Sequence, residues 1–309
     1  MANVINKKQE LQKEKSEFDF DELKLYFSEP YFIEMRNGYF IKITQPSIGD
    51  ILKLGDREVY SSITPFICNT TSFRVQLWDI GKDWNKVSDY ELFQWLVPTI
   101  SGVEFLFKRV EYIKNKLYND NISEEENLKN GQSKYIEIDK DINFSNLKLY
   151  TETKENEDGE IISEVVLYDP KQEILIDEKT YKHIREYVRT MFDNHPKEEF
   201  AKGKLAKKWI IEEDREKIKL EIDKNHGRRK SALLPMVSAL LNHPGFKYDL
   251  DGLKQLGIFA LMDSVRRLQL YEQSIAFLGG MYSGMMDCSK MGQEELNKRV
   301  NWLQDIYEK

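Results

Sequence analysis

The stretch that decides the fold lies in the C-terminal third of the chain, 258-IFALMDSVRRLQLYEQSIAFLGGMYSGMMDCSKMGQEELNKRVNWLQDIY-307. Apolar residues recur there at helical spacing, at Leu261, Val265, Leu268 and Ile275, which predicts a long helix over Ile258–Leu278. A stretch of small residues and methionines follows, and then a closing amphipathic helix. No nucleophile, base or set of metal ligands stands there at a spacing that chemistry requires. The stretch is therefore predicted to be a packing surface.

The methionines are its most informative residues, because unbranched and polarizable side chains adapt to variable partners. They also fill gaps in cores, so a buried role is the alternative interpretation. If the surface engages a partner, the binding residues are predicted to be the methionines together with the apolar positions of the closing helix: Met281, Met285, Met286, Met291, Leu296, Val300, Leu303 and Tyr307.

Length and composition indicate a protein with a real core. The 309 residues correspond to roughly two domains at ~150 residues each. Hydrophobic residues at 40% can build a core, and aromatic residues at 12% argue against intrinsic disorder. No run approaches the ~20 apolar residues of a membrane span. The polar N-terminus shows no secretory signal, so Cys68 and Cys288 are interpreted as reduced thiols of a cytoplasmic protein.

The acidic charge is concentrated in one region. The chain carries a net charge of −7, and the segment 113–173 holds 8 Lys and 15 Asp plus Glu, which alone gives −7. Such a block in an otherwise balanced chain indicates an insertion with its own solvated surface. It also argues against a general attraction to nucleic acid.

The N-terminal part contains strand and helix signals. Residues 1–22 are predicted to be a mobile leader, and Leu23–Phe27 and Tyr31–Met35 to be extended. Asn37-Gly38 between two β-favouring runs predicts a hairpin. Pro46 suits the first position of a helix that ends at Gly55. Ser88 with Glu91 predicts a capping box at the start of another helix.

The predicted fold class is α+β, with a leader (1–22), an N-terminal hairpin with helices (23–112), an acidic antiparallel β insertion (113–173) and a helical C-terminal domain (174–309). Three strands are expected in the insertion, at Lys134–Ile138, Asn146–Thr151 and Ile161–Tyr168, with a turn at residues 157–160. Asp177 is the predicted cap of a helix over Glu178–Phe192, and Lys197–Asp223 is expected to form a long charged helix.

Motifs for catalysis, cofactors and metals are missing from the sequence. The four histidines are scattered, there is no His-Glu-x-x-His, and no phosphate-binding glycine loop follows a strand. Glu124-Glu125-Glu126 lacks the ligand spacing of a calcium loop and is interpreted as a solvated loop. We therefore predict a protein that is not an enzyme and that needs no catalytic residue, cofactor or metal.

One basic stretch deserves a second interpretation. Between Lys197 and Lys230 the chain has 12 basic and 8 acidic residues, with Trp209 among them. A positive patch beside a tryptophan can bind single-stranded nucleic acid. A solvated helix crossed by ion pairs explains the same residues.

Three stretches carry a resemblance to a known family: Tyr39–Ile51, Leu77–Phe93 and Ala260–Asp287. On these stretches the chain resembles tail assembly chaperones of tailed bacteriophages that infect Firmicutes. The motifs are structural, so the resemblance transfers no catalytic residue.

The resemblance implies a non-enzymatic assembly factor that keeps the apolar helices of the tape-measure protein soluble until the tail tube polymerises. Its expected location is the host cytoplasm, with association with the virion as the alternative. The expected partner is that protein or a tail tube component, with a homo-oligomer as a further possibility and no membrane. A structural tail or baseplate subunit of the virion is the alternative, and a nucleic-acid-binding module is the third hypothesis.

Overall fold

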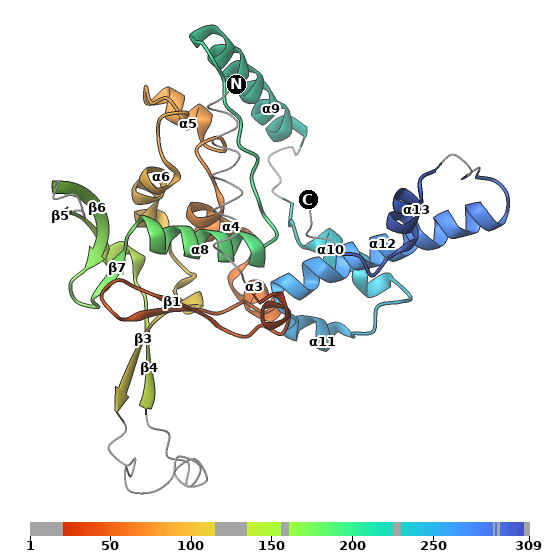
Figure 1. The fold of residues 1–309 in the computed structure, drawn as a ribbon, viewed down its shortest axis with the longest axis horizontal. Coiled ribbons are helices and arrows are strands. Elements are labelled where there is room, and N and C mark those ends of the chain that lie inside the picture. The colour runs from red at the N-terminus through yellow and green to blue at the C-terminus, as the bar shows by residue number, and fades with distance from the viewer. Residues whose placement is uncertain are drawn as a thin grey trace, which may run out of the picture. The chain divides into compact units, whose positions relative to one another are not determined.

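The computed structural model describes residues 21–114, 135–155, 161–224, 230–286, 288 and 291–305. It is an α+β structure, as predicted, with a four-stranded and a three-stranded antiparallel sheet (Figure 1). Contacts between residues divide the chain into two compact units. Unit 1 comprises residues 1–45 and 57–230, and unit 2 comprises residues 46–56 and 231–309. A short N-terminal segment therefore belongs with the C-terminal helices.

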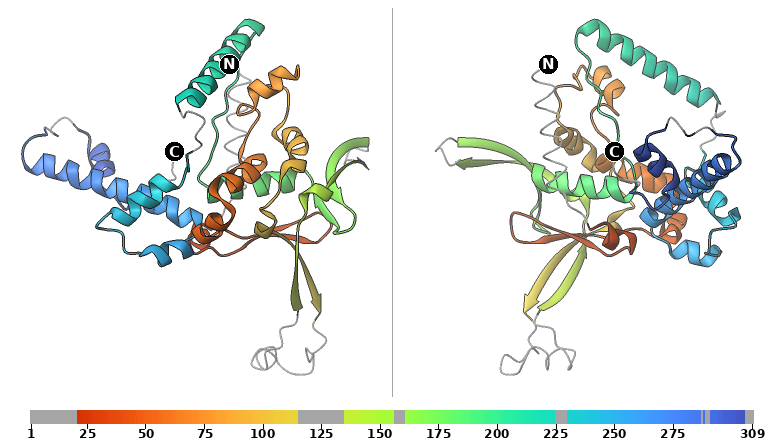
Figure 2. Two further views of the ribbon diagram at one scale, coloured as in Figure 1. Left: turned by 180° about the vertical axis from the view of Figure 1, so that it is seen from behind. Right: turned by 45° about the vertical axis from the view of Figure 1, so that its right-hand side comes forward.

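The first sheet grows from the predicted hairpin. Strands β1 (Tyr31–Glu34) and β2 (Phe40–Ile43) are antiparallel, and Gly38 in the connecting turn has a φ of 83°. Glycine has no Cβ and adopts this conformation without a steric cost. β3 (Phe107–Lys114) pairs with β2, and β4 (Tyr135–Asp141) pairs with β3. Figures 1 and 2 show the far ends of β3 and β4 extending away from the rest of unit 1.

We expected the acidic region to form one sheet of its own, but its strands belong to two sheets. Its first strand, β4, completes the N-terminal sheet, whereas β5 (Lys148–Glu155) and β6 (Ile161–Asp169) form a hairpin that β7 (Ile174–Ile176) extends. Strand partners depend on long-range register, which local alternation of residues does not reveal. The predicted turn at residues 157–160 lies outside the described residues.

The prediction of extended backbone at Leu23–Phe27 is wrong, because Glu22–Tyr26 forms the short helix α2. Asp21 caps it by accepting hydrogen bonds from the amides of Leu23 and Lys24. Satisfying two otherwise unpaired donors favours the helix over a strand. Except for Asp21 and Glu22, the predicted leader lies outside the described residues.

Unit 1 is built around an aromatic core. Its helices are α4 (Asp56–Ile67), α5 (Arg74–Asp79), α6 (Asp89–Leu96) and α8 (Glu178–Met191), with 3-10 turns at Val97–Thr99, Glu104–Leu106 and Phe144–Asn146. Phe66 of α4 stacks on Phe107 at 4.9 Å between ring centroids, and Phe93 of α6 stacks on Tyr181 of α8 at 4.4 Å. These fully buried rings join three helices to the sheet.

Two predicted caps in unit 1 are present. Asp177 accepts the amide of Thr180 at 2.8 Å and begins α8 as predicted. Ser88 accepts the amide of Glu91 at 3.0 Å at the start of α6. The return bond from Glu91 is not among the contacts of the described residues, so only one half of the predicted capping box is seen.

Helix α9 (Lys204–Lys224) begins seven residues later than predicted. The segment before it is held extended by side chains of the earlier chain. Asn69 donates to the carbonyl of Lys197, Trp84 to that of Glu199 and Asn85 to that of Ala201. These bonds satisfy backbone oxygens that a helix would otherwise pair. Gly203, with a φ of 86°, then precedes the helix.

Unit 2 contains α3 (Ile48–Leu54), α10 (Leu234–Asn242), α11 (Leu250–Gln255), α12 (Ile258–Tyr282) and α13 (Gln293–Val300). The prediction that Pro46 is the first residue of this helix is wrong, because α3 begins at Ile48. Ser47 caps the helix in a reciprocal box with Asp50, and Gly55 ends it with a φ of 96°. The first amides of a helix have no partner within the helix, and the hydroxyl oxygen of Ser47 accepts one of them, that of Asp50.

The start of α12 is fixed by α3. The amide of Ile48 donates to the carbonyl of Leu256 at 2.9 Å, and that of Ile258 donates to Pro46 at 3.2 Å. All five residues of Ile258–Met262 are buried, whereas of the residues that follow in the helix only Ser274 and Phe277 are buried. The core of unit 2 therefore anchors α12 mainly at its start.

Gly49 provides a test of this packing. A Cβ at this position would lie 3.0 Å from the carbonyl oxygen of Lys254. We expect Gly49→Ala to lower the free energy of unfolding of unit 2, because overpacking costs about 1–3 kcal/mol while alanine gains at most about 1 kcal/mol in a helix. Urea denaturation measures this loss of stability, and hydrogen exchange of residues 258–262 locates it in unit 2.

The matched control is Gly279→Ala in α12, where a Cβ has no neighbour within 4 Å. This variant should gain about 0.5–1 kcal/mol. Equal stability of the two variants would contradict the close approach of α3 and α11.

Candidate functional site

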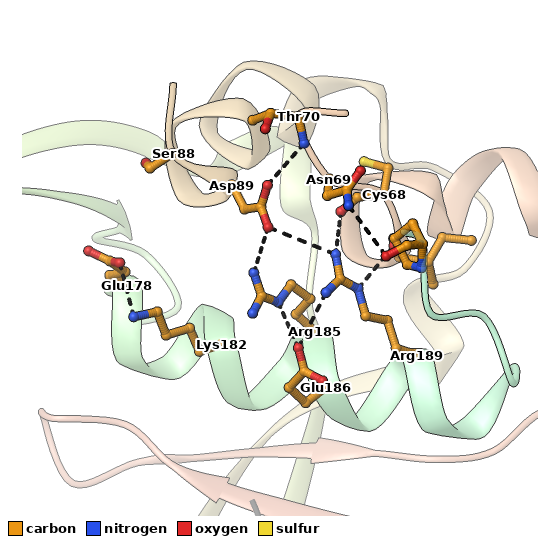
Figure 3. Close-up of polar contacts among 12 residues, drawn as sticks. Cys68, Asn69, Thr70, Ser88, Asp89, Glu178, Lys182, Arg185, Glu186 and Arg189 are labelled. Atoms are coloured by element: carbon orange, nitrogen blue, oxygen red, sulfur yellow. Dashed lines mark hydrogen bonds and ion pairs between the residues drawn. The ribbon is translucent and has the colours of Figure 1, made fainter. Parts of the chain in front are cut away.

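The densest polar cluster of unit 1 lies between α4, α6 and α8 (Figure 3). Asp89 accepts the backbone amide of Thr70 at 3.0 Å with one carboxylate oxygen. Its other oxygen accepts Nη1 of Arg185 at 2.8 Å and lies 4.0 Å from Nη2 of Arg189. Glu186 pairs with both arginines, at 3.0 and 3.3 Å. Two cations and two carboxylates thus neutralise one another in a largely buried site.

Arg189 also terminates α4. Its guanidinium donates to the carbonyl of Ile67 at 3.0 Å and to that of Cys68 at 2.7 Å. The last carbonyls of a helix have no partner inside the helix and carry the negative end of its dipole. A planar cation that bonds two of them is therefore a structural cap contributed by another helix.

A pocket of about 240 Å³ opens beside this cluster. Its charged lining is nearly balanced, with Lys182 and Arg185 against Asp89, Glu178 and Glu198. Lys182 is already paired with Glu178 at 3.2 Å. The pocket therefore carries no concentrated charge of one sign.

Burial suppresses the two most reactive groups nearby. It raises the pKa of the Cys68 thiol from 9.0 to about 12, so the thiol stays protonated at neutral pH. It also raises the pKa of Tyr90 to about 12, and the Tyr90 hydroxyl donates to the carbonyl of Ile176 at 2.7 Å.

The described residues contain no group of three or more His, Cys, Asp or Glu side chains able to hold a metal ion. Within the same ranges no helix is long and apolar enough to cross a bilayer. Glu124-Glu125-Glu126 and His226 lie outside the described residues. Nδ1 of His243 accepts the amide of Gly245 at 3.0 Å, and its Nε2 lies 3.1 Å from Glu272. This imidazole closes the turn after α10.

The basic stretch between Lys197 and Lys230 was the other candidate site from the sequence, and several of its cations form ion pairs. Lys207 contacts Asp83 at 2.5 Å and lies over the ring of Trp84, and Arg215 pairs with Asp79. Glu213 and Lys217, one turn apart on α9, also form an ion pair, at 2.7 Å. In the predicted helix Lys197–Asp223, Glu198 and Lys202 would stand one turn apart, but both lie before α9 and not within a helix. Arg228 and Arg229 lie outside the described residues.

The predicted methionine surface lies at the far end of α12. Met285 is 87% exposed and Met286 40%, while Met281 and Met291 are half-buried. Met286 folds back over Gly280, where an added Cβ would meet its sulfur at 2.8 Å. Among the four methionines, only Met285 projects freely. None of them is a core residue.

The closing helix α13 packs against α12. Its predicted binding residues Leu296 and Val300 are half-buried, and Leu303 beyond it is 70% exposed. Tyr307 lies outside the described residues. Arg267 of α12 donates to the carbonyls of Trp302 at 3.0 Å and Gln304 at 2.8 Å, which holds the end of the chain on α12.

Another face of α12 was not identified from the sequence as a site. Tyr271 is 37% exposed, Ile275 47% and Tyr282 82%, and they follow one another at spacings of four and seven residues. Gly279 lies between them with open space where a Cβ would be. The signal was available, because residues 273–286 contain no charged side chain in a chain that is 32% charged.

Comparison of the chain with models of protein families, with curated proteins and with solved structures finds no match. Its function therefore has to be inferred from its own surfaces and from the resemblance of its sequence.

The Asp89 cluster gives a stability prediction. Asp89→Asn removes the carboxylate that both arginines face, and breaking one partner of a buried ion pair costs about 3–5 kcal/mol. Unit 1 should lose most of this amount in chemical denaturation. Lys217→Gln, which removes an exposed pair, should change stability by less than about 1 kcal/mol. Similar losses in both variants would contradict the structural role of Asp89.

Cys68 gives a pH prediction. The unfolded thiol ionises near its ordinary pKa of 9.0 and the folded one near about 12, so the folded state binds the proton more tightly between these values. Stability should fall as pH rises through this window, and Cys68→Ser should reduce that fall. Native Cys68 should resist alkylation at pH 8 while Cys288, which is less buried, reacts. Rapid modification of native Cys68 would contradict its burial.

Proposed function

We propose that the protein is a non-enzymatic assembly factor of a bacteriophage tail, which binds apolar helices of a tail protein, such as the tape-measure protein, and keeps them soluble. The observation that carries the proposal is the exposed apolar face at the end of α12, where, among the described residues, only the ring of Tyr271 has an aromatic partner, Trp302, at 5.5 Å. Here the term α12 face denotes Tyr271, Ile275, Gly279, Tyr282 and Met285.

The spacing of the apolar residues along α12 suits a helix as the ligand. Leu268, Tyr271, Ile275, Leu278 and Tyr282 alternate at three and four residues, which is the a/d pattern of helices that pack side by side. Gly279 supports this geometry because a residue without a side chain lets a second backbone approach closely. A partner helix would continue the packing that α10 already makes with α12.

The chemistry of the α12 face suits an apolar ligand. Charged residues are depleted and aromatic residues and methionine are enriched at the centres of protein interfaces. The stretch 273–286 has this composition. A tyrosine that is 82% exposed and a methionine that is 87% exposed leave large apolar areas in water, and a partner helix would cover them.

The neutralised polar cluster and the protonated Cys68 support a role without bond-making chemistry. The resemblance of the sequence to tail assembly chaperones supplies the identity of the partner. Retention in mature virions would instead favour the structural-subunit alternative, and quantification of the chain in purified particles distinguishes the two.

The experiment is co-expression with a candidate tape-measure protein, followed by pull-down. Ile275→Asp with Tyr282→Asp should abolish recovery of the partner, because two carboxylates would be desolvated against apolar side chains. Met285→Asp with Met286→Asp should weaken recovery. Both pairs are exposed, so circular dichroism should show an unchanged fold.

The matched control is Leu234→Asp with Leu250→Asp, two residues of α10 and α11 that are each 63% exposed and lie outside the α12 face. This variant should bind normally. An equal loss of partner recovery with the control variant would contradict the proposed site. Full recovery of the partner by the Ile275/Tyr282 variant would contradict it as well.

A further inference from the structure

The inner side of α9 is fixed to α5 and its neighbours. Nη2 of Arg74 donates to Asp214 at 2.8 Å, Lys207 pairs with Asp83, and Ile211 is buried in a cluster with Leu77 and Trp84. The rotation of α9 about its own axis is therefore determined by charge and by packing. One side of the helix must face outward, as the views of unit 1 in Figures 1 and 2 also show.

The outward side is chemically uniform. At 3.6 residues per turn, an arc of roughly 100° opposite the buried side contains seven residues. All seven are exposed, and each is apolar or acidic: Leu205, Trp209, Glu212, Glu213, Glu216, Leu220 and Asp223. The lysines of α9 lie outside this set, which we name the acidic-apolar arc. A count of charges along the sequence does not reveal that the lysines of α9 are separated from the acidic-apolar arc.

Apolar side chains dominate the exposed area of the acidic-apolar arc. Trp209 is 69% exposed, Leu205 72% and Leu220 56%. Tryptophan is the residue most enriched among those that contribute strongly to binding. Because α9 is anchored on its other side, these side chains are presented on a rigid helix with little entropy left to lose on binding.

The carboxylates of the arc are available to a partner. Lys208 reaches Glu212 at 3.8 Å and Lys217 reaches Glu213 at 2.7 Å, and all four side chains are more than half exposed. Exposed pairs of this kind contribute only about 0.3–0.5 kcal/mol, so a partner cation can replace them. Glu216 has no ion pair with any of the described residues.

This arrangement is unfavourable for nucleic acid. A base stacked on Trp209 would bring its phosphates beside Glu212, Glu213 and Glu216, which lie three, four and seven residues along the same side. Like charges would repel, and the same holds for an anionic membrane surface or for the arc of a second copy. Complementary charge requires a cationic ligand with apolar anchors.

We propose that the acidic-apolar arc binds a basic amphipathic polypeptide segment of a partner protein, with Trp209 and Leu205 packing on its apolar residues and Glu212, Glu213 and Glu216 pairing with its lysines or arginines. The inference is independent of the α12 face, which lies in unit 2 and carries no charge.

The test is isothermal titration of the full chain with a synthetic amphipathic peptide of leucine and lysine, compared with a peptide of the same pattern in which glutamate replaces lysine. The lysine peptide should bind at least about tenfold more tightly, and added salt should weaken it. Trp209→Ala and the triple variant Glu212→Gln, Glu213→Gln, Glu216→Gln should each reduce its affinity by about tenfold or more.

Matched controls come from the same helix outside the arc. Ile222→Ala removes a side chain that is 61% exposed, and Glu221→Gln removes an exposed carboxylate. Both should bind like the unmodified chain. Equal losses in the controls would reduce the effect to general attraction by an acidic protein and overturn the proposal.

The other occupants give distinct results. Tighter binding of a single-stranded oligonucleotide or of anionic vesicles, lost in Trp209→Ala, would overturn the proposal. So would a concentration-dependent dimer in sedimentation that Trp209→Ala disrupts, because it would assign the arc to a second copy.

Discussion

The architecture of unit 1 depends on the cluster in which α8 meets the end of α4 and the start of α6. Arg185 and Arg189 stand one turn apart on α8 and share the carboxylate of Asp89. Arg189 also caps the carbonyls that α4 leaves unpaired. Buried charges are tolerated only when each is matched, so this cluster permits one relative position of the three helices. The aromatic core and the extended segment before α9 are arranged around that position.

Unit 2 is organised differently, since its central helix is anchored at one end. α3 and α11 hold the buried start of α12 through two backbone hydrogen bonds and the close approach at Gly49. The opposite end has only α13 packed beside it and leaves tyrosine, isoleucine and methionine side chains in water. Apolar area exposed on one ordered helix is an arrangement typical of binding surfaces.

Sequence patterns were sufficient where the determinants are local. Asn37-Gly38 located the hairpin, Asp177 the start of α8, and the periodicity of 258–278 most of α12. They failed where distant residues decide. The late start of α9 depends on donors from Asn69, Trp84 and Asn85, and β4 joined the first sheet by pairing with β3. The methionines were identified as a surface, but the acidic-apolar arc was not, because only tertiary anchoring shows which side of a helix faces outward.

The central claim is that the exposed end of α12 is the working surface of the protein. Hydrogen–deuterium exchange of the chain alone and in complex with the proposed helical partner tests it most directly. The account predicts slower exchange over residues 271–286 in the complex, with no change in α8. Protection confined to the pocket beside Asp89, or no protection in α12, would contradict it.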